Sequence, residues 1–238
     1  MCRGPFKESM YGIDCAKDSI CYDNVLYFVI SLRSALLQYK LFNDEGRTMT
    51  LRPDTYRARA VDPLVEAYLR AFGAVEIIGS KWCGKTWTAL AHGNSVIRLD
   101  DPHVRALVEA DPDLALEGES PHIVDEWQEV PSVWDATRRA VDDAAGKKGL
   151  FLLTGSSSPS KGSVVHSGTG RIARLHMRPM SLSELGESDE TVSLSGLFEG
   201  EFRKGPVNTD LRRIAQLICQ GGWPASLTLE EDASDLIA

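Results

Sequence analysis

One stretch of eight residues has the types and spacing needed to bind a phosphate chain. It reads Gly79-Ser80-Lys81-Trp82-Cys83-Gly84-Lys85-Thr86 and fits the pattern GxxxxGK[ST] of a phosphate-binding P-loop. Gly79 and Gly84 allow backbone conformations and a close phosphate approach that a Cβ would hinder. We expect the Lys85 ammonium to reach the β- and γ-phosphates and the Thr86 hydroxyl to bind Mg²⁺. Residues 79–86 are therefore predicted to bind the phosphates of a nucleotide.

Two neighbouring carboxylates follow an apolar run further along the chain, in Ile123-Val124-Asp125-Glu126. An apolar strand that ends in Asp-Glu is the Walker B arrangement of proteins with a P-loop. Asp125 is predicted to hold the Mg²⁺, directly or through water. Glu126 is predicted to orient and polarise the attacking water as a general base. The pattern is common when it stands alone, and its place downstream of the P-loop gives it this interpretation.

Two further segments carry candidate side chains for the same site. Leu152-Leu153-Thr154-Gly155-Ser156 places hydroxyls at the end of a predicted strand, where one of them can sense the γ-phosphate. Thr154 and Ser156 both qualify, and the choice between them stays open. Arg171 begins another predicted strand, and an arginine near the γ-phosphate, from this chain or a neighbouring subunit, would stabilise transition-state charge. The alternative for Arg171 is a solvated strand end or an ion pair with a carboxylate.

These residues need a parallel sheet to bring them together, and the apolar runs predict one. The predicted strands cover residues 74–78, 95–99, 122–124, 150–153 and 171–177. Helical spacing of apolar residues predicts helices over 63–72, 86–91, 102–109, 133–144 and 211–219, with Ser132 as the N-cap of the fourth. Strands that alternate with helices indicate an α/β fold with crossover helices on a parallel sheet. The P-loop follows the first of these strands and opens the next helix, as phosphate binding requires.

Composition excludes several classes of protein. With 238 residues, of which 43% are hydrophobic and 25% charged, the chain has enough apolar surface for a globular core without disulfides or metal. A net charge of −8 disfavours general binding of nucleic acid. The five cysteines have no metal-ligand spacing, and they predict reduced thiols in the cytoplasm. The longest apolar run, residues 25–30, is too short to span a membrane.

Taken together, these motifs resemble a family of AAA-type P-loop ATPases of bacteria and archaea that normally carries a C-terminal domain of unknown function. The resemblance covers residues 52–228 and rests on Tyr56-Arg57-Ala58-Arg59, Gly79 to Thr86, Ile123 to Trp127, Leu153 to Ser156, Gly170-Arg171 and Gly221-Gly222-Trp223-Pro224. It implies a three-layer α/β/α fold with a five-stranded parallel sheet in the order 5-1-4-3-2. It also implies ATP and Mg²⁺ as ligands, Glu126 as the catalytic base and Arg171 as an arginine finger.

The resemblance divides the chain into three parts. Residues 1–48 are expected to form an N-terminal extension, either an arm that binds a partner or a translated segment of little consequence. Residues 49–206 are expected to form the ATPase core, and residues 207–238 the start of a truncated helical lid. The function expected is Mg²⁺-dependent ATP hydrolysis that drives a conformational change in an unknown protein partner or a self-assembled complex. The alternatives are a nucleotide-binding module without turnover and, third, a small-molecule kinase.

Overall fold

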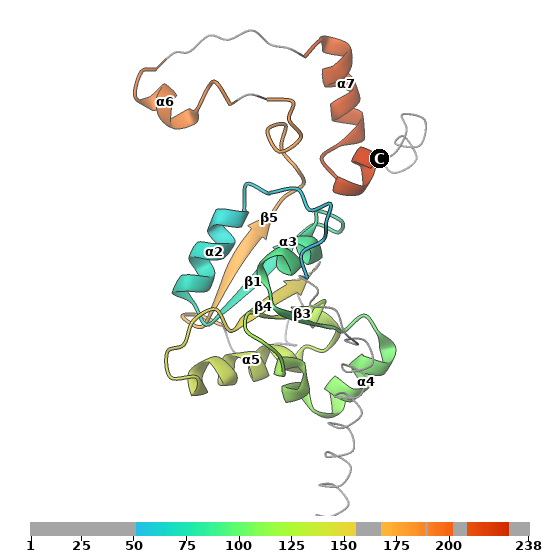
Figure 1. Ribbon diagram of the computed structural model, residues 1–238, viewed down its shortest axis with the longest axis vertical. Helices are drawn as coiled ribbons and strands as arrows, with labels where there is room; N and C mark the ends of the chain where they lie inside the picture. Colours follow the sequence, from blue (N-terminus) through green and yellow to red (C-terminus); the bar gives the residue numbers. More distant parts are fainter. Residues whose placement is uncertain (1–50, 156–167, 189, 202–208, 229–238) are drawn as a thin grey trace, which may run out of the picture. The chain divides into compact units, whose positions relative to one another are not determined.

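The computed structural model of the protein describes residues 51–155, 168–188, 190–201 and 209–228. Its centre is a five-stranded, fully parallel sheet in the order β2-β3-β4-β1-β5 (Figure 1). The strands are β1 (Ala74–Gly79), β2 (Ser95–Arg98), β3 (His122–Asp125), β4 (Phe151–Gly155) and β5 (Ile172–Met177). This confirms the predicted fold class, because the order 5-1-4-3-2 is the same arrangement numbered from the other edge. Ser156 and residues 1–48 lie outside the described part of the chain.

Two helices cover one face of the sheet, α2 (Asp62–Ala71) and α3 (Lys85–His92). Val75 and Ile77 of β1 point toward them and are fully buried, because successive side chains of a strand alternate between its faces. The buried cluster on this face also includes Val65, Cys83, Ala89, Leu90, Ile123, Leu152, Leu175 and Met177. Burial of these apolar side chains fixes α3, and with it the loop that precedes α3, against the sheet.

The other face of β1 presents Glu76, and α5 (Ser132–Asp143) packs near it. The Trp134 ring of α5 lies 4.9 Å from the Trp127 ring, centroid to centroid. Trp127 belongs to a short 3₁₀ helix, η2 (Trp127–Glu129), and the chain between β2 and β3 forms α4 (Pro102–Ala110) and η1 (Pro112–Leu116). Helices on both faces of the sheet make the three layers that the sequence predicted.

One predicted cap is wrong. Ser132 was expected to cap α5, but it is the first residue of this helix, and the N-cap residue is Pro131 without a side-chain cap. Pro131 already has helical backbone angles, φ −59° and ψ −23°, because its ring restricts φ to this range. The start of α5 therefore follows from the backbone preference of proline rather than from the serine hydroxyl.

Among the described residues after β5, the chain forms three short helices: α6 (Leu194–Phe198), α7 (Leu211–Gln220) and η3 (Pro224–Thr228). Helix α7 ends at Gly221, which has a φ of +68°, a conformation that glycine adopts at little cost. The next residue is tied to the segment after β5, since the Met180 N–H donates to the Gly222 carbonyl over 2.7 Å. Trp223 packs against the buried cluster of the core, so the chain after α7 is part of the packed structure.

Candidate functional site

The predicted phosphate-binding loop joins the end of β1 to the start of α3. Gly84 is the N-cap of α3 and has a φ of +101°, in the left-handed region that glycine favours. A Cβ at Gly79 would overlap the Met177 carbonyl oxygen. Both glycines are therefore required by the backbone path and by the packing of the loop against β5.

Lys85 is only 5% exposed although it carries a charge. Its Nζ donates to the carbonyl oxygens of Gly79, over 3.1 Å, and Ser80, over 2.9 Å. The ammonium is thus folded back onto the loop, where two backbone carbonyls accept its hydrogen bonds. The side chains of Ser80, Lys81 and Trp82 are exposed, whereas that of Cys83 is fully buried in the core.

The two predicted metal ligands contact each other. The Thr86 hydroxyl donates to Asp125 Oδ1 over 2.8 Å, and the Thr154 hydroxyl donates to the same oxygen. The Glu126 N–H donates to Thr154 Oγ1 over 3.2 Å. This meeting is possible because β4 lies between β3 and β1 in the sheet, so Thr154 sits between the acidic pair and the P-loop.

Burial raises the pKa of Asp125 above its ordinary value, although the hydrogen bonds from Thr154 and Thr86 act in the opposite direction. A hydroxyl and a carboxylate that converge beside the P-loop are oxygen ligands of the kind Mg²⁺ prefers. Thr86 and Asp125 therefore fit the predicted metal. The described residues contain no group of three or more His, Cys, Asp or Glu side chains placed to hold a metal ion.

Glu126 occupies a sharp turn directly after β3, with φ +56° and ψ +46°. The Gln128 side-chain amide donates to Glu126 Oε2. The following Trp127 is anchored in the core, because its indole N–H donates over 3.1 Å to Glu76 Oε1, and Glu76 is 1% exposed and also paired with Arg174 over 2.6 Å. This anchor holds the turn that presents Glu126 beside Asp125.

Arg171 does not join this group of residues. It lies just before β5 and pairs with Asp142 of α5, with 2.8 Å between Arg171 Nε and Asp142 Oδ1. Ile172 is in register with Ala74 at the start of β1, and Met177 with Gly79 at its end. Arg171 is therefore at the amino end of the strands, whereas the P-loop of the same chain is at their carboxyl end.

Three polar side chains near the site have no role in the sequence prediction, although Arg59 belongs to the Tyr56-Arg57-Ala58-Arg59 motif on which the resemblance rests. Arg98 ends β2 in register with Asp125, and its position at the end of a predicted strand was the available signal. Gln128 follows the acidic pair by two residues, and its contact depends on the turn at Glu126. Arg59 donates to the Cys83 carbonyl over 2.8 Å, a contact that no local pattern indicates.

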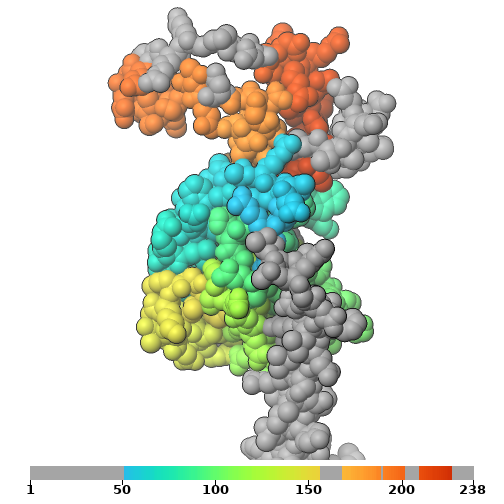
Figure 2. All heavy atoms as spheres, in the orientation of Figure 1, coloured from blue at the N-terminus to red at the C-terminus, as the bar shows by residue number. Residues whose placement is uncertain are grey.

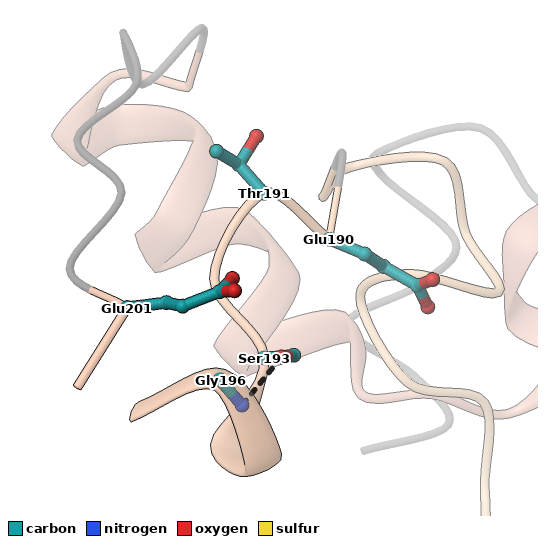
Figure 3. Close-up of a pocket in the computed structure, with 5 residues that line it drawn as sticks. All are labelled: Glu190, Thr191, Ser193, Gly196 and Glu201. Atoms are coloured by element: carbon teal, nitrogen blue, oxygen red, sulfur yellow. Dashed lines mark hydrogen bonds between the residues drawn. The ribbon is translucent and has the colours of Figure 1, made fainter. Parts of the chain in front are cut away.

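A small pocket lies in the segment after β5 and shares no residue with the P-loop or the acidic pair. Glu190, Thr191, Ser193, Gly196 and Glu201 line it, and the Gly196 N–H donates to Ser193 Oγ over 3.0 Å (Figure 3). Its two carboxylates and small polar groups offer none of the phosphate-binding features of the P-loop. We assign it no part in the site.

Residues 71–186 match a family model described as an AAA domain. The matched part runs from the end of α2 to the segment after β5, so it contains the P-loop, the acidic pair and Thr154. No curated protein matches the chain. Within the described residues, no helix combines the length and the apolar character needed to cross a membrane.

Proposed function

We propose that this protein binds ATP with Mg²⁺ at residues 79–86 and hydrolyses it to ADP and phosphate. The observation that supports this best is the 2.8 Å hydrogen bond between Thr86 and Asp125. It joins the two sequence motifs at the carboxyl edge of the sheet, and that edge is where nucleotides bind in open α/β folds. The similarity of residues 71–186 to an AAA domain agrees with a nucleotide-binding, ATPase-like role.

Each P-loop residue has a defined part in this proposal. The backbone N–H groups at the start of α3, together with the helix dipole, attract the phosphates. Lys85 exchanges the carbonyls of Gly79 and Ser80 for phosphate oxygens when nucleotide binds. Thr86 and Asp125 would hold the Mg²⁺, which supplies neutralisation of phosphate charge when it is bound.

Glu126 is the proposed general base, since a carboxylate at this turn can accept a proton from water. Thr154 donates to Asp125 and accepts from the Glu126 N–H, so it holds the two acidic residues relative to each other. In the AAA-type proteins that the sequence resembles, hydrolysis drives conformational change in a protein partner or an assembly of subunits. We propose the same use here, with the partner unidentified.

A nucleotide-binding module without turnover is the second candidate. The hydrogen bond from Gln128 to Glu126 Oε2 favours it, because it engages one of the two carboxylate oxygens that could otherwise accept a proton from water.

Two variants of the full chain test the proposal. Lys85→Ala should lower the affinity for Mg·ATP in titration calorimetry by on the order of 2–4 kcal/mol, since a charged partner of the phosphates is lost. Lys148→Ala, an exposed lysine in the turn before β4, serves as the matched control. Unchanged affinity of Lys85→Ala would refute binding at the P-loop.

Glu126→Gln should keep the affinity for ATP but lose phosphate release, because an amide cannot take a proton from water. Glu129→Gln, which removes the charge of a nearby carboxylate paired with Arg105, is the control. A parent protein that binds ATP and releases no phosphate would support the second candidate. A Glu126→Gln protein that is as active as the parent would mean that the acidic pair is structural.

A further inference from the structure

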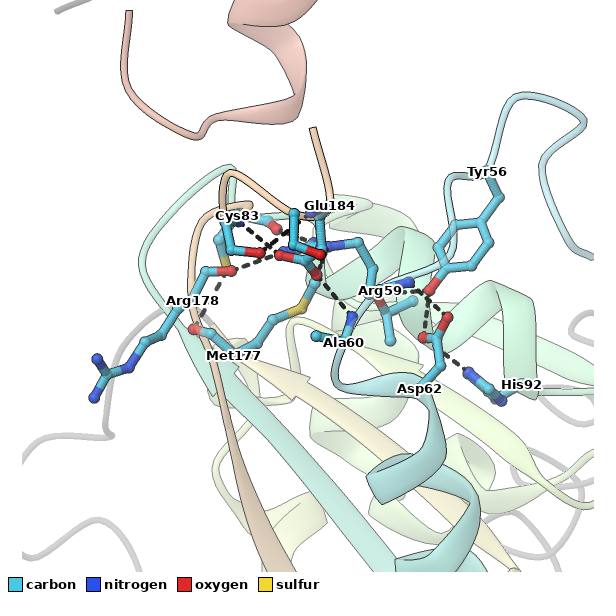
Figure 4. Close-up of polar contacts among 12 residues, drawn as sticks. Tyr56, Arg59, Ala60, Asp62, Cys83, His92, Met177, Arg178 and Glu184 are labelled. Atoms are coloured by element: carbon cyan, nitrogen blue, oxygen red, sulfur yellow. Dashed lines mark hydrogen bonds and ion pairs between the residues drawn. The ribbon is translucent and has the colours of Figure 1, made fainter. Parts of the chain in front are cut away.

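Arg59 is a buried arginine whose guanidinium group donates to three acceptors in two segments of the chain, the P-loop and the segment after β5 (Figure 4). Only 7% of the residue is exposed. Its Nη1 donates to the Cys83 carbonyl over 2.8 Å, its Nη2 to the Arg178 carbonyl over 2.9 Å and its Nε to Glu184 Oε1 over 2.9 Å. The planar guanidinium holds N–H donors on three separate nitrogens, so it can reach acceptors that lie too far apart for the single nitrogen of an ammonium group.

The first of these contacts lies inside the P-loop. In a trans peptide the carbonyl and the following N–H point in opposite directions. With the Cys83 carbonyl turned toward Arg59, the Gly84 N–H points away from it. A Cβ at Gly84 would lie 3.1 Å from Arg59 Nη1, so the guanidinium also lies directly beside Gly84. Arg59 thus determines the direction of a backbone N–H in the loop that must bind phosphate.

Glu184 anchors the other side of Arg59. Its carboxylate accepts from the Ala60 N–H over 2.8 Å and from the Ser181 N–H over 2.7 Å. Burial acts to raise the pKa of Glu184, but the hydrogen bonds from Ser181, Ala60 and Arg59 outweigh it and lower the pKa below its ordinary value. Glu184 therefore stays ionised, and it joins the segment before α2 to the segment after β5, whose surfaces meet in Figure 2.

The segment that carries Arg59 is itself fixed to α2 and α3. The Tyr56 hydroxyl donates to Asp62 Oδ1 over 2.6 Å and accepts from the Thr88 hydroxyl, with 3.3 Å between the two oxygens. Asp62 also accepts from the Arg59 N–H over 2.8 Å and pairs with His92 over 3.1 Å. These contacts hold the backbone of Arg59 at a constant position relative to the helix that begins at Lys85.

We propose that Arg59 is a positioning residue for the P-loop, and that its pair with Glu184 makes nucleotide affinity depend on the segment after β5. This inference rests on the proposed nucleotide binding. A purely structural ion pair would need only a positive charge beside Glu184. The positioning role also needs the hydrogen bond to the Cys83 carbonyl. The link extends to the chain after α7 through the hydrogen bond between Met180 and Gly222.

Arg59→Lys separates these two roles in the full chain. The lysine keeps a positive charge beside Glu184, but one ammonium cannot reach all three acceptors. We expect ATP affinity to fall about tenfold, as for the loss of a hydrogen bond made by a charged group. Arg213→Lys is the matched control, because Arg213 pairs with Glu187 of the same segment over 2.6 Å. An Arg59→Lys effect no larger than that of the control would overturn the proposal.

A second measurement needs no nucleotide. Cys83 is fully buried, and its modification by iodoacetamide, resolved by peptide mass spectrometry, reports release of the loop. We expect Arg59→Lys and Glu184→Gln to increase the rate at Cys83 severalfold, while the rate at the exposed Cys219 stays unchanged and serves as the internal standard. Parental labelling of Cys83 in both folded variants would overturn the positioning role. If the parent protein binds no ATP, the proposed nucleotide binding is wrong. The labelling rate of Cys83 would still decide whether Arg59 holds the loop.

Discussion

Asp125 lies at the buried end of β3, with 5% of the residue exposed. Loss of contact with water disfavours its charged form and raises its pKa, and the hydroxyls of Thr154 and Thr86 compensate only in part. A carboxyl group whose pKa is higher in the folded than in the unfolded protein lowers the free energy of unfolding when it is ionised. The reduction in the free energy of unfolding is fully present at pH values above the raised pKa. It diminishes as the pH falls from that pKa toward the ordinary pKa of an aspartate. The burial of Asp125, a proposed Mg²⁺ ligand, therefore lowers the stability of the ligand-free protein when the carboxylate is ionised.

Because the ionised Asp125 carboxylate destabilises the folded protein, we predict that Asp125→Asn raises the melting temperature of the ligand-free protein at pH 8. The amide keeps an oxygen that accepts from Thr86 and Thr154 but carries no charge. The rise in melting temperature should shrink as the pH is lowered from 8 into the range where Asp125 becomes protonated in the folded protein. Binding of Mg·ATP should weaken in the same variant.

Thermal unfolding at several pH values checks this prediction. Asp113→Asn is the control, because Asp113 is an exposed carboxylate paired with an exposed Arg139, and such pairs contribute little to stability. A melting temperature of Asp125→Asn below that of the parent at pH 8 would show that the ionised carboxylate is stabilising after all.

At the scale of elements, apolar runs were enough to predict the sheet. Phe151 to Leu153 is apolar without interruption and forms β4, which is buried throughout. Helix α7, which was predicted over residues 211–219, ends before Gly221 for the local reason that glycine accepts a positive φ. The strand order, by contrast, came from the resemblance to AAA-type ATPases, because local patterns do not determine which strands are neighbours.

The contacts that no pattern predicted are those between distant segments. Arg59 and Glu184 are 125 positions apart, and neither stands in a motif with the other. The turn that gives Glu126 a positive φ depends on Trp127 reaching the buried Glu76, 51 positions away. Local patterns could therefore single out the residues that meet beside the P-loop but not the distant residues that orient them.

The join between the end of α7 and the core is predicted to depend on Gly222. A Cβ at this position would overlap the Met180 carbonyl oxygen, and a backbone atom cannot move aside as a flexible side chain can. We expect Gly222→Ala to cost about 1–3 kcal/mol, as other overpacked substitutions do, and to lower the melting temperature by roughly 2–12 °C. Limited proteolysis should cut more readily between Met180 and Gly222.

Gly200→Ala is the control for this substitution. Its φ is +82°, but nothing lies within 4 Å of the added Cβ, so it measures the strain of a positive φ without any clash. Equal effects of the two substitutions would mean that contact with Met180 does not hold the chain after α7.

At the scale of the whole molecule, we expect the folded core to be independent of residues 1–48. The strands, the P-loop and the ion pair of Arg59 all lie beyond this segment. Deletion of residues 1–48 should leave the melting temperature and the affinity for ATP unchanged. A fall of more than about 4 °C, equivalent to at least ~1 kcal/mol in a chain of this size, would show that the extension packs as part of the fold.

Arg171 raises the question of whether one chain forms a complete catalytic site. The P-loop of its own chain is at the opposite end of the strands, and Arg171 is 46% exposed where it pairs with Asp142. In AAA-type assemblies an arginine at this position completes the site of a neighbouring subunit, and the resemblance of the sequence implies the same here. A guanidinium group suits this role because its planar fork can bind two oxygens of a phosphate.

If Arg171 acts in the neighbouring site, only assembled chains hydrolyse ATP efficiently, and the rate should rise faster than linearly with protein concentration. Arg171→Ala and Lys85→Ala should each be nearly inactive alone. When the two are mixed, the Lys85→Ala chain can still donate its arginine to the intact P-loop of the Arg171→Ala chain, so part of the activity should return. Arg138→Ala, which removes another arginine that pairs with Asp142, controls for loss of that ion pair. No recovery on mixing, together with full activity of a demonstrated monomer, would mean that Arg171 only stabilises the fold through Asp142.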